Sequence, residues 1–129
     1  MTARILIVDD EEADRLLIQG ILARAGYDTI VAPSGEAALR AYLDAGVDVV
    51  ITDLQMPDVH GFELISILRD FTPRPALIAV SGTGPIQLYM AESLGAHWTL
   101  QKPLNPELLL DTVERALAER AANEERRSG

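Results

Sequence analysis

The sequence predicts an α/β fold, a doubly wound five-stranded parallel sheet flanked by five helices in a three-layer α/β/α sandwich. Short apolar runs rich in Val, Ile and Leu alternate along the chain with longer segments of helical periodicity. The central run, residues 47–52, is mostly apolar and β-branched, as expected of a strand buried on both faces. Strands joined by helical crossovers must be parallel, and such crossovers are right-handed.

Acids, caps and prolines set the expected boundaries of these elements. The first strand stops at residues 9–12, whose acids suit the positive end of the following helix. Ser34 and Asn105 are expected to cap the second and fifth helices, and Pro85 and Pro106 fit the first position of the fourth and fifth. The expected strands are residues 4–8, 29–32, 47–52, 76–80 and 97–100. The expected helices are residues 13–25, 34–45, 62–69, 86–94 and 106–120.

Apolar residues in two helices predict which face of each helix is buried. In the first helix, leucines and isoleucines recur at helical spacing, at Leu16, Leu17, Ile21 and Leu22. In the fourth helix, two alternatives are open. Either Leu88, Ala91 and Leu94 face the sheet and leave Ile86, Tyr89 and Met90 toward solvent as an interaction site, or the helix is rotated and buries some of them.

Composition narrows the class of protein. The chain has 129 residues, of which 48% are hydrophobic, and this suits one domain at residues 1–121 with a polar, fraying tail at 122–129. The absence of cysteine excludes disulfides and thiolate metal sites. A net charge of −9 argues against nucleic acid or an anionic membrane as a partner. With no export signal and no apolar stretch near the ~20 residues that span a bilayer, we expect a cytoplasmic protein.

The ends of the expected strands supply the groups of a candidate site. All strand carboxyl ends of a parallel sheet lie on one edge, which would collect Asp9, Asp10, Asp53, Ser81 and Lys102. Three carboxylates and one ammonium leave a formal charge of −2. Like charges about 4 Å apart cost roughly 4 kcal/mol per pair at an effective dielectric near 20. The cluster therefore needs raised carboxyl pKa values or a bound cation, and oxygen-only ligands favour Mg²⁺ or Mn²⁺.

In this arrangement the sequence resembles the receiver domains of two-component response regulators, whose fold is the flavodoxin-like sandwich. The resemblance extends from Arg4 to about Leu117. Each motif alone is weak, but the set in this order is specific. The motifs are the acidic pair Asp9-Asp10, Asp53 with Met56-Pro57 and Gly61, Ser81-Gly82, and Lys102-Pro103.

The resemblance implies a phosphoacceptor and a metal site. Asp53 would accept a phosphoryl group from a phosphohistidine on a histidine kinase or phosphotransfer protein. Asp10, Asp53 and the backbone carbonyl of Gln55 would hold Mg²⁺ directly, and Asp9 would hold it through water. Lys102 would pair with Asp53 and then with a phosphoryl oxygen.

The resemblance also implies how the signal leaves the site. Ser81 would bond another phosphoryl oxygen and pull its loop inward, shifting the fourth helix. The chain would be a stand-alone signalling phosphoacceptor, not an enzyme beyond self-phosphorylation and self-dephosphorylation. Its target would be a protein, or a second copy of the chain docking on the fourth helix. Many receivers have an aromatic switch residue where Thr99 stands here, and Trp98, one residue earlier, points to the opposite face of a strand.

Three other functions compete with this interpretation. A pseudo-receiver would bind a partner without phosphorylation; the complete acceptor set argues against it, but Thr99 leaves it open. A flavodoxin-like cofactor binder needs a phosphate-binding loop after the first strand. Residues 9–12 stand at that place and are all acidic, so they would repel a phosphate. A phosphatase with an aspartyl nucleophile usually has a second acid where Gln55 stands. His60 and His97 lie away from strand ends, and we expect surface or satisfied histidines there.

Overall fold

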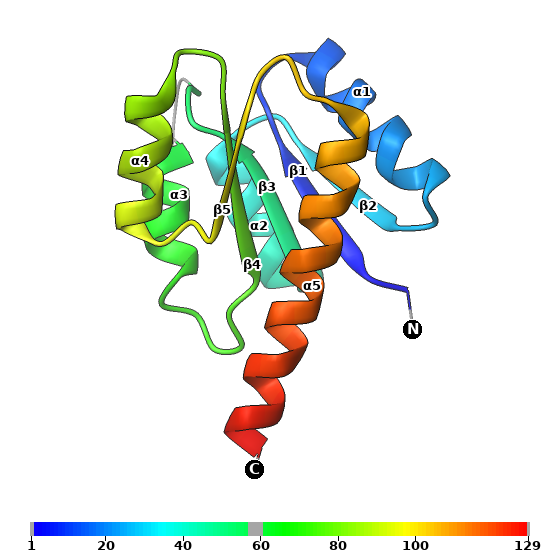
Figure 1. Cartoon of the computed structure of the whole chain (residues 1–129), viewed down its shortest axis with the longest axis vertical. Coiled ribbons are helices and arrows are strands. Elements are labelled where there is room, and N and C mark those ends of the chain that lie inside the picture. The colour runs from blue at the N-terminus through cyan, green and yellow to red at the C-terminus, as the bar shows by residue number, and fades with distance from the viewer. Residues whose placement is uncertain (1, 57–60, 129) are drawn as a thin grey trace.

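The computed structural model describes residues 2–56 and 61–128 and confirms the predicted architecture (Figure 1). One sheet of five parallel strands has the order β2-β1-β3-β4-β5. The strands are β1 (Arg4–Val8), β2 (Asp28–Ala32), β3 (Val49–Asp53), β4 (Ala76–Ser81) and β5 (Trp98–Gln101). The helices are α1 (Glu12–Arg24), α2 (Gly35–Ala45), α3 (Gly61–Leu68), α4 (Pro85–Leu94) and α5 (Pro106–Ser128).

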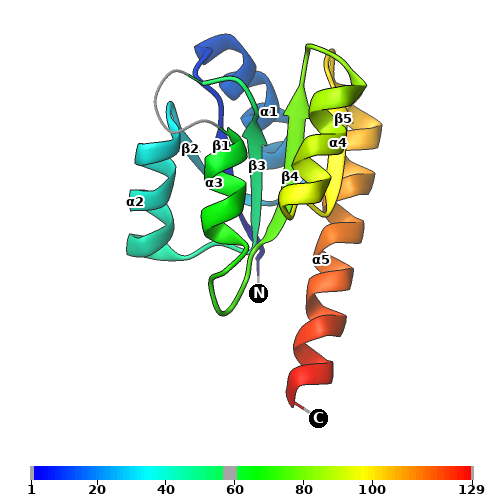
Figure 2. The same cartoon turned by 90° about the vertical axis from the view of Figure 1, so that its left-hand side faces the viewer.

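Helices cover both faces of the sheet, as the two views in Figures 1 and 2 show, and one apolar cluster lies on each face. Successive residues of a strand point to opposite faces, so Ile5 and Ile7 of β1 pack with α1 and α5, whereas Leu6 and Val8 pack with α2, α3 and α4. Strands β1, β3 and β4 are buried almost throughout. This burial on both faces explains why their sequences are continuous apolar runs.

The sheet order creates the edge on which a site can form. The chain proceeds outward from β1 to β2 and then returns to β3 on the other side of β1. Such a reversal leaves a crevice outside the carboxyl ends of the two central strands, the usual ligand position in open α/β sheets. Asp9 directly follows β1, and Asp53 is the last residue of β3.

The predicted helix caps are confirmed by hydrogen bonds. Ser34 Oγ accepts from the backbone N–H of Ala37 at 3.1 Å. Asn105 Oδ1 accepts from the first-turn N–H groups of α5, at 2.9 Å and 3.1 Å. Pro85 occupies the first turn of α4, as expected. Each cap satisfies backbone donors that the helix itself leaves without partners.

Helix α1 has a different buried face from the one its leucines suggest. Leu16 and Leu17 are exposed, whereas Ile18 and Leu22 are buried against the sheet. A polar contact favours this orientation of the helix. Asp14, four residues before Ile18, accepts a hydrogen bond from Lys102 at the strand ends. With Asp14, Ile18 and Leu22 on one side of the helix, Leu16 and Leu17 fall on the outside.

Helix α5 is longer than predicted. It continues to Ser128, so the expected helix end near Arg120 is wrong, and its last turns project beyond the sheet (Figures 1 and 2). The expectation that residues 122–129 fray stays a prediction. Arg120 ties the helix to the body of the domain, donating to the carbonyl of Arg74 at 3.1 Å and to Asp48 Oδ1 at 3.1 Å. No helix in the described parts of the chain has the length and apolar character needed to cross a bilayer.

Candidate functional site

Three carboxylates converge at the carboxyl ends of β1 and β3, as the sequence predicts. Asp9, Asp10 and Asp53 each place one carboxylate oxygen within 4.8 Å of the others. Asp9 and Asp53 are buried and Asp10 is exposed, so the cluster opens to solvent on one side. Such a set of hard oxygen ligands fits a divalent ion such as Mg²⁺ or Mn²⁺.

Local structure holds Asp9 in place. Its Oδ1 accepts from the backbone N–H of Glu11 at 3.0 Å, and its carbonyl accepts from Arg15 Nη1 at 2.8 Å. Its own N–H donates to the carbonyl of Ala32 at the end of β2. These contacts position the carboxylate between the sheet edge and the start of α1.

Lys102 reaches the cluster from the loop after β5. Its Nζ lies 3.0 Å from Asp9 Oδ2 and 3.5 Å from Asp53 Oδ2, which confirms that the sheet brings these groups together. Its shortest contact, 2.8 Å, is to Asp14 Oδ2 on α1. Nothing in the sequence distinguishes Asp14 as a residue of this site. It stands among the acids at the start of the first helix, and only the rotation of α1 distinguishes it from them.

The pKa values of both Lys102 and Asp53 are raised in the cluster. Burial alone would lower the pKa of Lys102, but hydrogen bonds to Asp14 and Asp9 and the charge of Asp53 raise it above its ordinary value. Burial raises the pKa of Asp53, and the nearby charge of Asp9 adds to the rise. The N–H of Gln55 and the ammonium of Lys102 oppose this rise without cancelling it. Without a cation, ionised Asp53 is therefore destabilised in the fold.

Ser81 is fully buried at the end of β4 and bonds within its own loop. Its Oγ accepts from the N–H of Thr83 at 3.1 Å and lies 2.9 Å from Thr83 Oγ1. Gln55 Nε2 lies 3.5 Å from Thr83 Oγ1, and the backbone N–H of Gln55 donates to Asp53 Oδ1 at 3.3 Å. Thr83, absent from the sequence analysis, thus links the loops after β3 and β4. A hydroxyl two residues after a serine is too common for its sequence position alone to indicate this role.

Gly61 allows the end of β3 and the start of α3 to meet. An added Cβ would clash with the carbonyl oxygen of Asp53 and would lie 2.6 Å from Leu54 Cα. Any side chain here would push the backbone at the end of β3 away. The other residues of this motif's loop, Pro57 to His60, lie outside the described residues, so the expectation for His60 stays a prediction.

The remaining aromatic and histidine positions agree with the sequence analysis. Trp98 packs with the α1 and α5 layer, whereas Thr99 Oγ1 donates to Glu92 of α4 at 3.3 Å. These neighbours therefore do point to opposite faces of β5. His97 Nδ1 accepts from the N–H of Leu77 at 3.3 Å, and burial, with help from the charge of Arg74, lowers its pKa. It is a satisfied histidine at the opposite edge of the sheet.

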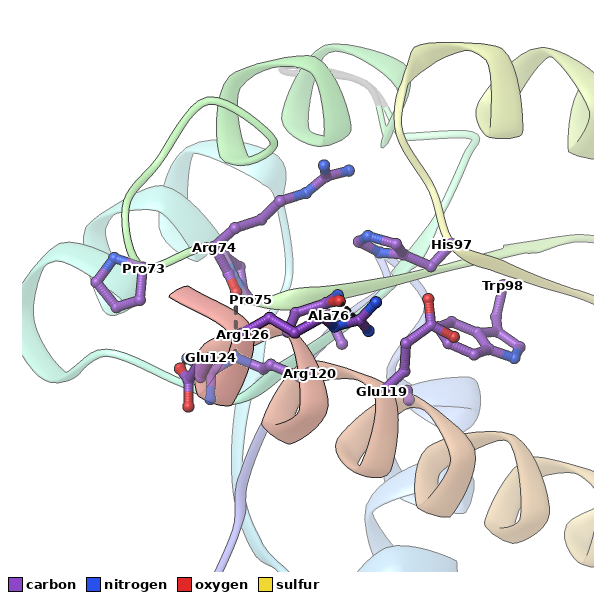
Figure 3. Close-up of a pocket in the computed structure, with 12 residues that line it drawn as sticks. Pro73, Arg74, Pro75, Ala76, His97, Trp98, Glu119, Arg120, Glu124 and Arg126 are labelled. Atoms are coloured by element: carbon purple, nitrogen blue, oxygen red, sulfur yellow. Dashed lines mark hydrogen bonds and ion pairs between the residues drawn. The ribbon is translucent and has the colours of Figure 1, made fainter. Parts of the chain in front are cut away.

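That opposite edge holds a cavity of about 360 Å³ between the starts of β4 and β5 and the second half of α5 (Figure 3). Trp98 and His97 line one side of it, and Arg120 extends along α5 on the other. Arg120 is engaged within the chain through Asp48, Glu124 and the carbonyl of Arg74. We attribute to this cavity region a structural role, which is to anchor the extended α5. It lies at the edge of the sheet opposite the acidic cluster.

Helix α4 exposes an apolar face, which decides between the two alternatives for its rotation. Ala91 is fully buried, and Leu88 and Leu94 pack against the core. The outward residues Ile86, Tyr89 and Met90 are 75%, 71% and 48% exposed. The helix begins four residues after Ser81, so a movement of that loop would reach this face directly.

Comparison with known proteins agrees with this geometry. A curated relative, the sensory/regulatory protein RpfC of Xanthomonas campestris, is 31% identical over 115 residues, which are 85% of this chain and 16% of RpfC. The DNA-binding transcriptional regulator NtrC of Rhizobium meliloti is 35% identical over 119 residues, 91% of this chain and 24% of NtrC. The chain thus spans a minor part of these relatives.

Solved structures and a family model extend the similarity. The chemotaxis response regulator CheY4 of Vibrio cholerae superposes with a TM-score of 0.83 at 33% identity, over 91% of this chain and all of CheY4. The model of the response regulator receiver domain matches residues 5–114. That span includes the acidic pair, the β3 aspartate, the buried serine and the lysine. The chain therefore belongs to the response regulator receiver domain family.

Proposed function

We propose that the chain accepts a phosphoryl group onto Asp53, in a Mg²⁺-dependent reaction, from a histidine kinase or a phosphotransfer protein. Receiver domains are signalling phosphoacceptors supplied by such donors. The observation that carries the proposal is the convergence of Asp9, Asp10 and Asp53 with Lys102 Nζ 3.5 Å from Asp53. Asp53 offers a carboxylate nucleophile at the open edge of the sheet.

The residues present fit the metal. Asp10, Asp53 and the carbonyl of Gln55 would hold Mg²⁺ or Mn²⁺, with Asp9 bound through water. Such an ion would supply positive charge that offsets the carboxylates and the phosphoryl oxygens of the donor. Without it the clustered acids repel both one another and an anionic donor.

The transfer itself forms one bond and breaks one. A carboxylate oxygen of Asp53 attacks phosphorus, the P–N bond of the phosphohistidine breaks, and its electron pair returns to the imidazole nitrogen. The transition state spreads charge over three equatorial oxygens. Lys102 supplies an ammonium for one of them, and Ser81 a hydroxyl for another once its bond with Thr83 is exchanged.

Phosphorylation at this site would also change the conformation of the neighbouring loop and helix. A phosphoryl group on Asp53 adds nearly two negative charges and new acceptor oxygens, which favour inward movement of Ser81 and of residues 82–85. Helix α4 would then present Ile86, Tyr89 and Met90 differently to a target protein or a second copy of the chain. A cytoplasmic location is part of the proposal.

The proposal is tested by intact mass after incubation with acetyl phosphate. The wild-type chain should gain one phosphoryl group with Mg²⁺, labile in alkali as an acyl phosphate is, and none with EDTA. Asp10→Ala should lose Mg²⁺ binding and phosphoryl uptake together, because a ligand that neutralises the ion is gone. Glu36→Ala removes an exposed acid on α2 and is the control. Undiminished uptake by Asp10→Ala would refute the metal site, and a wild-type chain that never gains phosphate would favour the pseudo-receiver.

A second measurement tests the output face. Tyr89→Ala should leave phosphorylation of Asp53 intact but weaken phosphorylation-dependent association by about 1–2 kcal/mol, as expected for an anchoring side chain. Leu43→Ala on α2 is the matched control, because Leu43 is 70% exposed but lies away from the Ser81 loop. Amide hydrogen exchange with and without beryllofluoride should change over residues 81–94. A change confined to the surroundings of Asp53 would show that α4 is the wrong face.

A further inference from the structure

Lys102 is shared among three carboxylates, and the closest is not one that the proposed function uses. Its Nζ lies 2.8 Å from Asp14, 3.0 Å from Asp9 and 3.5 Å from Asp53. An ammonium has three protons and can address all three. The contact to Asp53 is at the outer limit of a hydrogen bond, whereas the other two have the lengths of charge-assisted bonds.

Asp14 is held where it is by the packing of α1. Ile18, one turn further along the helix, is buried against the sheet, and Arg15 is bonded to the carbonyl of Asp9. The carboxylate of Asp14 therefore points at the strand ends from a rigid element. Its side chain is 33% exposed and that of Lys102 is 21% exposed, so water weakens this pair only in part.

We propose that Asp14 is a positioning residue that holds Lys102 in a resting place, back from Asp53, and that competes with the phosphoryl group for the ammonium. This inference rests on the proposed function of Asp53. A phosphoryl group adds charge on Asp53 itself and draws Lys102 away from Asp14. The strength of the Asp14 contact then sets how readily the site closes on its phosphoryl group.

Release of Lys102 has opposite consequences for two ligands. In the resting site, a freed ammonium settles on Asp53 and competes with Mg²⁺ for that carboxylate. With Mg²⁺ and a phosphoryl group bound, the same freed ammonium reaches the phosphoryl oxygens without having to leave Asp14. Loss of Asp14 should thus weaken the metal and tighten the phosphoryl mimic. General damage to the fold would weaken both.

The experiment compares Asp14→Asn with Glu12→Gln, which removes the same charge from the exposed first turn of α1. Calorimetric titration measures Mg²⁺ affinity, and a second titration with beryllofluoride at saturating Mg²⁺ measures closure. Relative to Glu12→Gln, Asp14→Asn should raise the Kd for Mg²⁺ and lower that for beryllofluoride, each by about threefold to fivefold, the size expected for a partly exposed ion pair. In a Lys102→Ala background, Asp14→Asn should no longer differ from Glu12→Gln.

The outcomes separate the two proposals. If the wild-type chain binds beryllofluoride and both charge variants behave alike, Asp14 has no hold on Lys102, while the proposed function stands. A difference that persists without Lys102 would also overturn the inference, because Asp14 would act by another route. If the wild-type chain binds Mg²⁺ but not beryllofluoride, the proposed function fails, and Asp14 cannot compete with a phosphoryl group for Lys102. The Mg²⁺ titration then decides by itself whether Asp14 holds Lys102 back from Asp53.

Discussion

Asp53→Asn should abolish phosphoryl uptake and at the same time make the metal-free fold more stable at neutral pH. Uptake is lost because an amide oxygen cannot replace the carboxylate as nucleophile. The gain in stability follows from the site's electrostatics, since burial and the charge of Asp9 raise the pKa of Asp53. An amide of the same shape removes the charge that the fold tolerates poorly.

The sign of this effect can be checked through its pH dependence. A carboxyl group with a raised pKa in the folded state contributes stability below its unfolded value of 3.8, and that contribution is lost as pH rises through the raised value. Urea unfolding in EDTA should therefore show the variant gaining on the wild-type chain over this interval and keeping the advantage above it. Asp44→Asn, an exposed acid on α2, should show no such gain. A variant less stable than wild type at neutral pH would contradict the assignment of strain to Asp53.

Gly61→Ala should destabilise the domain by about 3 kcal/mol or more, at the upper end of what overpacking costs. The added methyl would meet the backbone at Asp53 and Leu54, where no side-chain rotation can relieve the clash. The start of α3 or the end of β3 must move, so phosphoryl uptake should fall as well. Thermal and urea unfolding measure the first effect, and intact mass measures the second.

Gly20→Ala is the matched control for that substitution. Gly20 lies inside α1, where an added Cβ would meet only the far end of Arg24, at 3.9 Å. The same chemical change should therefore stabilise the protein by about 0.5–1 kcal/mol, because alanine loses less backbone entropy than glycine in a helix. If Gly61→Ala were as stable as Gly20→Ala, the close approach of α3 to β3 would not be required.

The fold class and most residues of the site follow from sequence patterns alone. Continuous apolar runs mark strands buried on both faces, and a parallel sheet brings their carboxyl ends to one edge. Asp9, Asp53 and Lys102 could therefore be placed together before any coordinates, although they lie far apart along the chain. The caps at Ser34 and Asn105 were equally predictable, because each depends on a bond to backbone within three residues.

The rotation of the helices and the end of α5 depend instead on packing between elements that are distant in sequence. Leu16 and Leu17 recur with Ile21 and Leu22 at the spacing of a buried helix face, but the packing of Ile18 and the contact of Asp14 rotate α1 so that Leu16 and Leu17 are exposed. Helix α5 continues past Arg120, whose side chain contacts Asp48 and the carbonyl of Arg74, both distant in sequence. The contact of Asp14 with Lys102 has the same origin. Contacts between distant elements depend on how those elements pack, and no local pattern in the sequence records them.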